Sequence, residues 1–362
     1  MRSYEGGTDA EPTKISRPRS GTRAADDQSI RIKSLFRDGQ GNIHLDWPKE
    51  KLEEALKDEK GTLWVDLFED DPECFGNIEK LLRDVFKFHP LAIEDALCET
   101  HITKLDDWGE YLYLVFHTLE FDEDTDFLRV HELDVFLGKN YVVTFHNTPI
   151  PSLQQLHKNI EREPNSRLRN GADYVLYHIL DTIVADYLPV IEHLDEAIDA
   201  AQDEVFRKPT RETLQSIFRV KRSALRFHRL LAPVREVLNR LARDEYDPIQ
   251  QDHRVFFRDV YDHIVRVQDI AETLRDLIAG ALDTYLSAIS NRTNDIMKAM
   301  TLATVMFLPM SFLTSFFGMN FFGDNLVFQT PLPRFFLFFG SCLIMLSTPI
   351  GMYLWAKHRR WF

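Results

Sequence analysis

The chain has 362 residues, a net charge of −14 at neutral pH and three cysteines. The acidic balance disfavours a nucleic-acid surface, so no nucleic-acid partner is expected. Cys74, Cys98 and Cys342 are unclustered and odd in number, which excludes a zinc-finger spacing and a disulfide framework.

The first part of the chain is predicted to be a tail followed by an α/β domain. Residues 1–28 mix Gly, Pro, Ser and both charge signs with almost no large apolar residue, which predicts a disordered tail without a signal peptide. Residues 29–170 alternate strand and helix patterns and predict a cytoplasmic α/β domain. The strands are expected at residues 30–36, 62–68, 111–121, 128–137 and 141–145, and helices at 47–57 and 71–86.

Strand patterns stop at residue 171, and the rest of the chain is predicted to be helical. Residues 171–247 predict a pair of antiparallel cytoplasmic helices, at 172–206 and 211–244. A third helix starts near Pro248, and no polar loop interrupts it before Gly318. If it is continuous it has roughly 70 residues, or about 100 Å at 1.5 Å per residue. Residues 248–320 are therefore expected to be a stalk helix that continues into the membrane.

Two apolar stretches predict transmembrane helices. Residues 299–323 carry no charge, and residues 335–356 form a second apolar stretch after an external loop at 321–334. Each is long enough for a hydrocarbon core about 30 Å thick, which takes roughly 20 helical residues. Basic residues flank the spans on the same side, which places both termini in the cytoplasm, the basic tail 357–362 included. These residues are Arg292, Lys298, Lys357, Arg359 and Arg360.

A stripe of small polar residues follows the third helix at spacings of three and four. It comprises Asp276, Gly280, Asp283, Ser287, Ser290, Asn294, Met297, Thr301, Thr304, Leu308, Ser311, Ser315 and Gly318. The neighbouring face is predicted to be apolar, with Leu274, Leu277, Ile278, Leu282, Leu286 and Ile289. The stripe is therefore expected to face water in a pore lined by the same helix from several subunits.

Within the membrane the predicted lining is Asn294, Thr301, Thr304, Leu308, Ser311 and Ser315, with Met297, Met300 and Leu308 as hydrophobic constrictions. The alternative is that the small hydroxyl residues only let transmembrane helices pack closely. Neutral oxygens suit contact with the water shell of Mg²⁺, which dehydrates reluctantly. The stripe has no Cys or His, which disfavours direct ligation of Zn²⁺ or Cu²⁺.

Residues 294–321, NDIMKAMTLATVMFLPMSFLTSFFGMNF, resemble the pore helix of the CorA family of magnesium channels, whose signature is Gly-Met-Asn at the outer end of the first span. Residues 89–95, HPLAIED, are similar to a cytoplasmic segment of the same family. The resemblance covers roughly residues 30 to 362. It implies a funnel-shaped homopentamer in which the first transmembrane helix is continuous with the stalk helix. The acidic N-terminus argues against a transit peptide, so a cell membrane, inner or plasma, is expected.

The resemblance also implies residue roles. Gly318, Met319 and Asn320 would form the outer ring that selects hydrated Mg²⁺, and Asn294 a polar ring at the inner mouth. Met297 and Met300 would form the hydrophobic gate. Asp95 and Asp283 would bind regulatory Mg²⁺ between subunits and so close the pore, although Asp95 could instead start or cap a helix. Acidic residues of the helix at 172–206 are expected to be a solvated face: Glu192, Asp195, Glu196, Asp199, Asp203 and Glu204.

The expected function is non-enzymatic: a gated channel for Mg²⁺ influx, with Co²⁺ or Ni²⁺ as surrogates. The chain has no GxxxxGK[ST] phosphate loop. Its loop FFGDNLVFQTPLP lacks the acidic Met-Pro-Glu-Leu segment typical of the family, which leaves a Zn²⁺ transporter of the same superfamily as an alternative. From another class, a membrane-tethered hydrolase or signalling module would use His131, Glu132 and Asp134. On a strand, however, His131 and Glu132 would point to opposite faces.

Overall fold

The computed structural model describes residues 15–16, 31–71, 75–98, 102–122, 127–163, 167–318 and 334–358. The predicted tail, apart from residues 15–16, lies outside the described residues, as do Met319, Asn320, the loop up to residue 333 and residues 359–362. Contacts divide the chain into two units, one of Met1–Glu204 with Thr210–Ala281 and the other of Val205–Pro209 with Leu282–Phe362. Each unit is described in turn.

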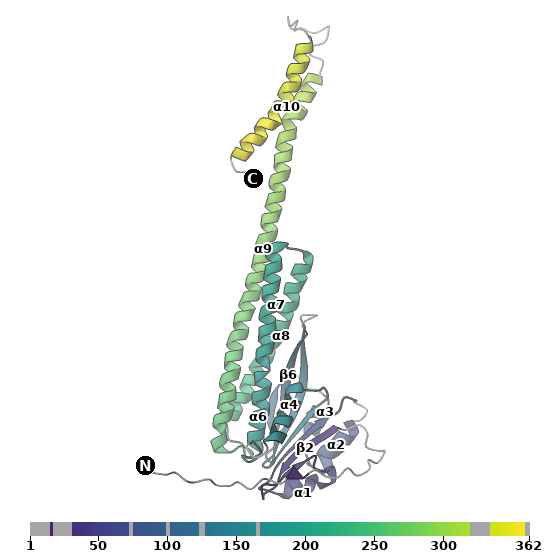
Figure 1. The fold of residues 1–362 in the computed structure, drawn as a ribbon, viewed down its shortest axis with the longest axis vertical. Helices are drawn as coiled ribbons and strands as arrows, with labels where there is room; N and C mark the ends of the chain where they lie inside the picture. Colours follow the sequence, from purple (N-terminus) through teal and green to yellow (C-terminus); the bar gives the residue numbers. More distant parts are fainter. Residues whose placement is uncertain are drawn as a thin grey trace, which may run out of the picture. The chain divides into compact units, whose positions relative to one another are not determined.

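The first unit contains one mixed sheet (Figure 1). Its described strands follow the order β1-β3-β2-β4-β8-β7-β6-β5. The strands are β1 (Ile15–Ser16), β2 (Arg31–Arg37), β3 (Ile43–Leu45), β4 (Thr62–Phe68), β5 (Lys104–Asp107), β6 (Leu112–Asp122), β7 (Phe127–Leu137) and β8 (Tyr141–His146). The predicted strand at 62–68 coincides with β4, and the other four predicted strands match within one residue. β3 and β5 were not predicted because they are short, and β5 is mostly charged.

The sheet is buried on both faces, as the alternation along its strands requires. In β4, Leu63, Val65 and Leu67 belong to one hydrophobic cluster, while Trp64 belongs to the other. The first cluster lies beneath α1 (Leu52–Lys57, preceded by a 3₁₀ turn at Lys49–Lys51), α2 (Phe75–Asp84) and α3 (Pro90–Leu97). The second cluster lies against α4 (Pro151–Arg162) and the long helices.

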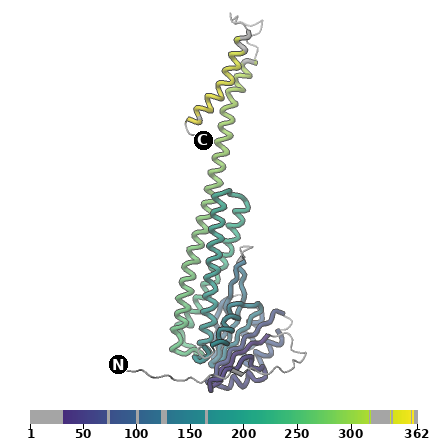
Figure 2. The backbone as a smooth tube through the Cα atoms, in the orientation of Figure 1, coloured from purple at the N-terminus to yellow at the C-terminus, as the bar shows by residue number. Residues whose placement is uncertain are grey.

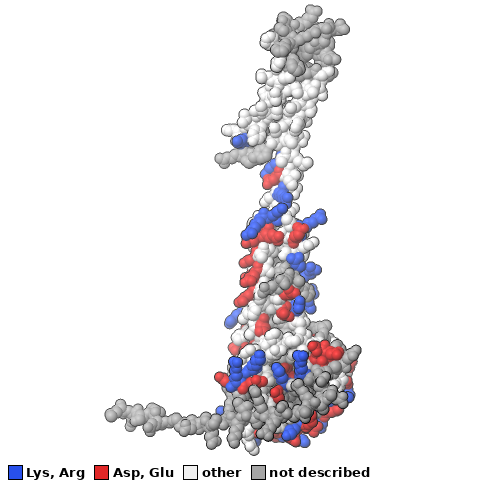
Figure 3. Space-filling model, turned by 45° about the vertical axis from the view of Figure 1, so that its right-hand side comes forward, with Lys and Arg blue, Asp and Glu red and all other residues white. Residues whose placement is uncertain are grey.

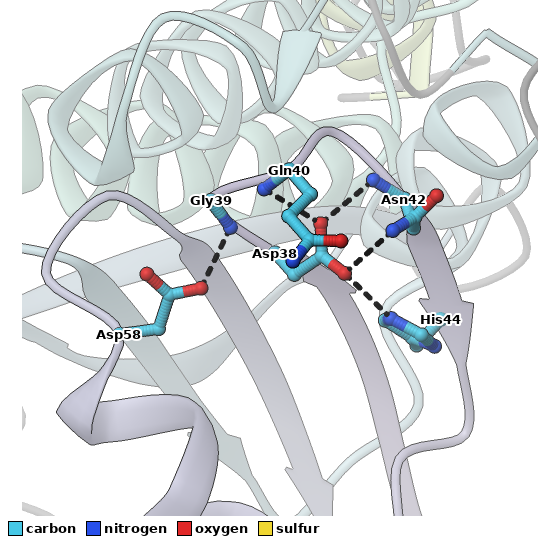
Figure 4. Close-up of polar contacts among 6 residues, drawn as sticks. All are labelled: Asp38, Gly39, Gln40, Asn42, His44 and Asp58. Atoms are coloured by element: carbon cyan, nitrogen blue, oxygen red, sulfur yellow. Dashed lines mark hydrogen bonds and ion pairs between the residues drawn. The ribbon is translucent and has the colours of Figure 1, made fainter.

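A tight turn at Asp38 fixes the β2–β3 hairpin (Figure 4). Asp38 Oδ1 accepts hydrogen bonds from the backbone N–H groups of Gln40 (3.0 Å) and Asn42 (2.8 Å), and Asp38 Oδ2 lies 3.3 Å from His44 Nε2. Gly39 donates to Asp58 Oδ2 at 2.6 Å, and a Cβ at this glycine would lie 2.9 Å from Asp58 Oδ1. Partial burial raises the pKa of Asp38, but these hydrogen bonds outweigh it and lower the pKa. The carboxylate oxygens of Asp38 are therefore occupied by the turn.

Four long helices follow the sheet: α6 (Ala172–Ala185), α7 (Tyr187–Arg207), α8 (Arg211–Arg243) and α9 (Arg254–Gly318), which follows a 3₁₀ turn at Gln251–His253. The expected single helix at 172–206 is interrupted at Asp186, between α6 and α7. Pro189 has no N–H to donate to the carbonyl of Ala185, which accounts for the interruption. Thr210 caps α8 through a reciprocal capping box with Thr213.

The helices pack through regular apolar stripes. Within the first unit, Phe257, Val260, Ile264, Val267, Ala271, Leu274 and Ile278 of α9 are buried in the core. Their spacing of three and four gives one helix face. The expected acidic face of α7 is exposed at Glu192, Asp195, Glu196, Asp199, Asp203 and Glu204.

The second unit holds the rest of α9 and α10 (Arg334–His358), the yellow helix near the C-terminus in the tube drawing (Figure 2). Among the described residues, two helical stretches are long and apolar enough to span a membrane: Ala172–Arg207, which comprises α6 and α7, and Gln251–Phe316. In Ala172–Arg207, half of the most apolar window is buried within the fold. In Gln251–Phe316, none of that window is buried. The apolar stretch Phe339–Trp355 of α10 is shorter.

Candidate ion-conduction helix and regulatory residues

The predicted pore stripe lies on an exposed face of α9 in the second unit. Asn294, Thr301, Thr304, Ser311 and Ser315 are exposed. The apolar side chains of the predicted constrictions are exposed as well: Met297 by 59%, Met300 by 67% and Leu308 by 65%. Within the part of the chain that the structure describes, these side chains belong to no hydrophobic core.

The opposite face of the same helix segment is half-buried. Its residues are Leu302, Met306, Pro309, Met310 and Leu313. At 3.6 residues per turn the middle of this face lies about 160° from the middle of the polar stripe. The stripe therefore does not serve the packing that this unit makes internally.

α10 has a half-buried face of its own. It is formed by Ser341, Cys342, Met345, Thr348, Pro349 and Met352, which again recur at helical spacing. The outward residues of α10 are large and apolar, with Leu343 72% and Leu346 64% exposed. Large apolar side chains turned away from the packed face are typical of a helix in lipid.

The hydroxyl of Thr304 is already oriented by its own helix. Thr304 Oγ1 donates to the carbonyl of Met300 at 3.0 Å. Since its one proton is used there, the hydroxyl presents lone pairs outward. The water molecules of a hydrated cation point their oxygens at the ion, so they donate hydrogen bonds outward. They therefore need hydrogen-bond acceptors on the wall.

Charge is absent from the predicted spans. Lys298 Nζ forms an ion pair with Asp295 Oδ1 at 3.1 Å, and the helix then carries no Asp, Glu, Lys or Arg up to Gly318. In the space-filling view this part of α9 and α10 is white, while red and blue side chains gather on the remainder (Figure 3). The charge boundary coincides with the predicted start of the first span.

The stripe continues along the rest of α9. Asp276 and Gly280 are exposed in the first unit, where Leu274 and Ile278 are buried on the opposite side. Asp283, in the second unit, is also exposed.

The expected apolar neighbouring face is buried only in part. Leu277 is 40% and Leu286 57% exposed, because their positions lie about 80–100° to either side of the stripe, away from the buried face.

The segment HPLAIED forms the start and body of α3. His89 is the N-cap, and its Nδ1 accepts a hydrogen bond from the N–H of Leu91 at 3.2 Å, while Pro90 occupies the first helical turn. The His89 ring stacks on Trp108 at 4.4 Å. Asp95 lies inside α3, not at its cap, which corrects the alternative that it starts or caps a helix.

Asp95 is held by a lysine that the sequence analysis missed. Lys104 Nζ, at the start of β5, forms an ion pair with Asp95 Oδ2 and a second with Asp106 Oδ2 at 2.9 Å. Partial burial lowers the pKa of Lys104, but the bonds to both carboxylates outweigh it and raise the pKa. No local pattern indicates this contact, because it depends on β5 lying beside α3.

Beneath Lys104 lies a carboxylate that is buried, that of Asp134. The ammonium lies 5.0 Å from the centre of the Tyr113 ring, and the Tyr113 hydroxyl donates to Asp134 Oδ1 at 2.6 Å. Burial raises the pKa of Asp134 well above its usual range.

The residues of the tethered-hydrolase alternative do not converge. Glu132 and Asp134 are buried, whereas His131 lies on the other face of β7, 3.4 Å from Glu120 Oε2. Across the part of the chain that the structure describes, no group of three His, Cys, Asp or Glu side chains is placed to hold a metal ion. The regulatory metal site at Asp95 and Asp283 stays a prediction.

The family described as "CorA-like Mg2+ transporter protein" matches residues 59–358. The chain belongs to this family. Its members are membrane transporters of divalent cations. Membership of this family accounts together for the predicted spans, the charge-free end of α9 and the Gly-Met-Asn sequence. The "Cobalt/magnesium transport protein CorA" of Thermotoga maritima is 34% identical over 245 residues, which is 68% of this chain and 70% of that protein.

Solved structures share the fold. The complete structure of the CorA magnesium transporter from Methanocaldococcus jannaschii matches with a TM-score of 0.73 at 20% identity, over 91% of this chain and 98% of that chain. The ZntB cytoplasmic domain from Vibrio parahaemolyticus matches with a TM-score of 0.56 at 9% identity, over 73% of this chain and 99% of that one.

Proposed function

We propose that the chain is a gated channel that lets Mg²⁺ enter the cytoplasm as a hydrated ion, with Co²⁺ or Ni²⁺ as surrogates. The observation that carries this proposal is the exposed polar stripe of α9, opposite the half-buried face of the same helix. Stripe hydroxyls and amides contact the water shell of the ion, and Gly318, Met319 and Asn320 form the outer ring. An ion of charge +2 gains about 4.6 kcal/mol on crossing 100 mV, negative inside, so no ATP is needed.

The pore forms at the axis of a homopentamer in a cell membrane, with α9 and α10 spanning the bilayer and both termini in the cytoplasm. Exposure of Leu277 and Leu286 supports this arrangement, because these residues lie on the two flanks of the stripe. Neighbouring copies of α9 would cover both flanks and leave the stripe facing the axis.

Met297 and Met300 form the gate, and Mg²⁺ bound by Asp95 and Asp283 of adjacent subunits closes it. A ligand shifts a conformational equilibrium by its differential affinity for the two states. The cytoplasmic ion therefore stabilises the closed pentamer, and its loss lets the pore open. Met297→Gly should leak at high internal Mg²⁺, since a wider constriction wets more readily.

The test is metal uptake into liposomes that carry the purified protein. Wild type should take up Mg²⁺ with an inside-negative potential. Ser311→Leu should reduce the uptake rate by more than about tenfold, because an apolar side chain on the pore wall favours dewetting. Phe307→Leu is the matched control, because Phe307 is exposed off the stripe. Equal rates for both variants would rule out the stripe as the pore lining.

A Zn²⁺ transporter is the second candidate, supported by the fold similarity to the ZntB cytoplasmic domain and by the loop without an acidic segment. The same liposomes distinguish the two. Uptake of Zn²⁺ but not Mg²⁺ at equal concentration would favour this candidate.

The regulatory assignment has its own test. Mg²⁺ should protect the stalk of wild type from protease, and Asp95→Ala with Asp283→Ala should abolish that protection. Equal protection of both proteins would show that sensing does not depend on this pair.

A further inference from the structure

Lys104 occupies the carboxylate to which the proposed regulatory ion would bind. Its ammonium contacts Asp95 Oδ2 directly, and the Asp95 side chain is 41% exposed. The Asp95 side chain is thus partly accessible to a cation from solution, and its Oδ2 is already paired with a cation of the chain. An incoming ion meets a like charge at the site.

The lysine is held in place by more than Asp95. Its ammonium also contacts Asp106 Oδ2 at 2.9 Å and faces the Tyr113 ring at 5.0 Å. Tyr113 is fully buried, and its hydroxyl is fixed by the 2.6 Å bond to Asp134. Only 26% of the Lys104 side chain is exposed, so the ammonium has few other positions.

This arrangement allows the ammonium to leave Asp95 at low cost. An ammonium has three donors, and on release from Asp95 it keeps Asp106 and the aromatic face. Since Asp106 is also 41% exposed, it can hold the charge without further burial. The carboxylate of Asp95 can therefore change partners between the ammonium and a metal ion.

We infer that Lys104 is an internal competitor for the regulatory cation: it pairs with Asp95 when the metal is absent, and its displacement towards Asp106 sets the concentration at which divalent cations close the channel. This inference rests on the proposed regulatory role of Asp95. Lys104 is a positioning residue and does not touch the ion. It lowers the affinity of the site by repelling the ion and by occupying its ligand.

The experiment measures protection of the full-length protein from protease as Mg²⁺ is titrated. Lys104→Met removes the charge and keeps an unbranched side chain over Tyr113. It should lower the half-protecting Mg²⁺ concentration about tenfold, within the usual range of coupling between two sites. Lys104→Arg should stay near wild type. Lys139→Met is the matched control, because Lys139 pairs with Asp247 at 2.8 Å on an exposed surface.

A second variant should shift the half-protecting Mg²⁺ concentration in the opposite direction, which distinguishes competition from a folding defect in Lys104→Met. Asp106→Asn removes the alternative partner of Lys104, so the ammonium stays on Asp95 and the half-protecting concentration should rise. A merely structural role would shift both variants in the same direction. That result, or an unchanged midpoint in Lys104→Met, overturns the inference.

Failure of the proposed function gives a different result. If Asp95→Ala keeps wild-type protection, Asp95 is not a regulatory ligand, and the inference falls with it. If Asp95→Ala loses protection while Lys104→Met keeps the wild-type midpoint, the regulatory site stands and only the competition is disproved.

Discussion

Two helical stretches that each contain a window apolar enough to cross a membrane have opposite surroundings in this protein. Ala172–Arg207 could cross a membrane by composition alone, yet half of its most apolar window is covered by the sheet and the other helices. None of the corresponding window of Gln251–Phe316 is buried. Apolar surface needs a partner that excludes water. The first unit supplies that partner itself, whereas the apolar window of α9 has none within the part of the chain that the structure describes.

The surrounding charges explain why the two stretches differ. α7 carries acidic residues on its exposed face, so one side of the helix is suited to water. The last part of α9 has no charge on any side. Its single polar stripe is too narrow for a water-exposed helix and suits a pore wall.

The largest expected effect is a loss of conduction by the second unit that leaves the folding of the first unit unchanged. Asn320→Ala should abolish Mg²⁺ uptake into liposomes, because the outer ring loses the amides that contact the water shell. Thermal unfolding of the first unit and the pentameric mass should not change. Normal uptake by an assembled Asn320→Ala protein would remove Asn320 from the selective ring.

Truncating one phenylalanine in each unit tests the comparison of burial directly. Phe227 of α8 is fully buried, so Phe227→Ala should lower the free energy of unfolding by about 3–5 kcal/mol. Phe307 of α9 is 66% exposed, and Phe307→Ala should leave that free energy within about 0.5 kcal/mol of wild type. Denaturant titration in detergent, followed by tryptophan fluorescence, measures both. A similar loss in both variants would mean that Phe307 packs in a protein core.

Two buried carboxylates of the first unit should respond to pH in opposite directions. Burial raises the pKa of Asp66, but bonds from His146 and Thr144 outweigh it, so its pKa is lowered. Its contribution is present above its unfolded pKa and is lost as the pH falls through the folded pKa. Asp66→Asn should therefore cost about 3 kcal/mol at pH 7, the order expected for breaking a buried pair, and less in acid.

Asp134 is the matched comparison, because burial raises its pKa. The folded chain keeps this proton, so stability falls as the pH rises above the unfolded pKa towards the folded one. Asp134→Asn should remove that decline, so its free energy of unfolding should rise relative to that of wild type between pH 4 and pH 7. Parallel pH profiles for the two variants would contradict the assignment of their charge states.

The smallest expected effect concerns a histidine on α6. Burial, with help from Arg167, lowers the pKa of His178 to about 4. The unfolded chain therefore binds this proton first, and stability is lost as the pH falls from about 6.5 towards 4. His178→Phe keeps a ring against Tyr174, which lies 4.7 Å away, and should flatten the profile in this window. An unchanged profile in thermal unfolding at pH 7 and pH 5 would show that His178 is charged in the fold.

The sequence by itself determined the features that repeat along one element. The length of α9, its charge-free end and the direction of its polar stripe follow from spacing and composition, because a helix brings residues three and four apart to one face. The strand at residues 62–68 followed from a short, mostly apolar segment. The acidic face of α7 was predicted in the same way.

Only the tertiary structure decided which distant residues meet. Trp64 donates to Thr144 at 3.1 Å across 80 positions, and Lys104 reaches Asp95 only because β5 lies beside α3. Which face of α9 is buried also depends on tertiary packing, and the exposure of Leu277 and Leu286 follows from it. Such contacts depend on strand order and helix register, which local periodicity does not encode.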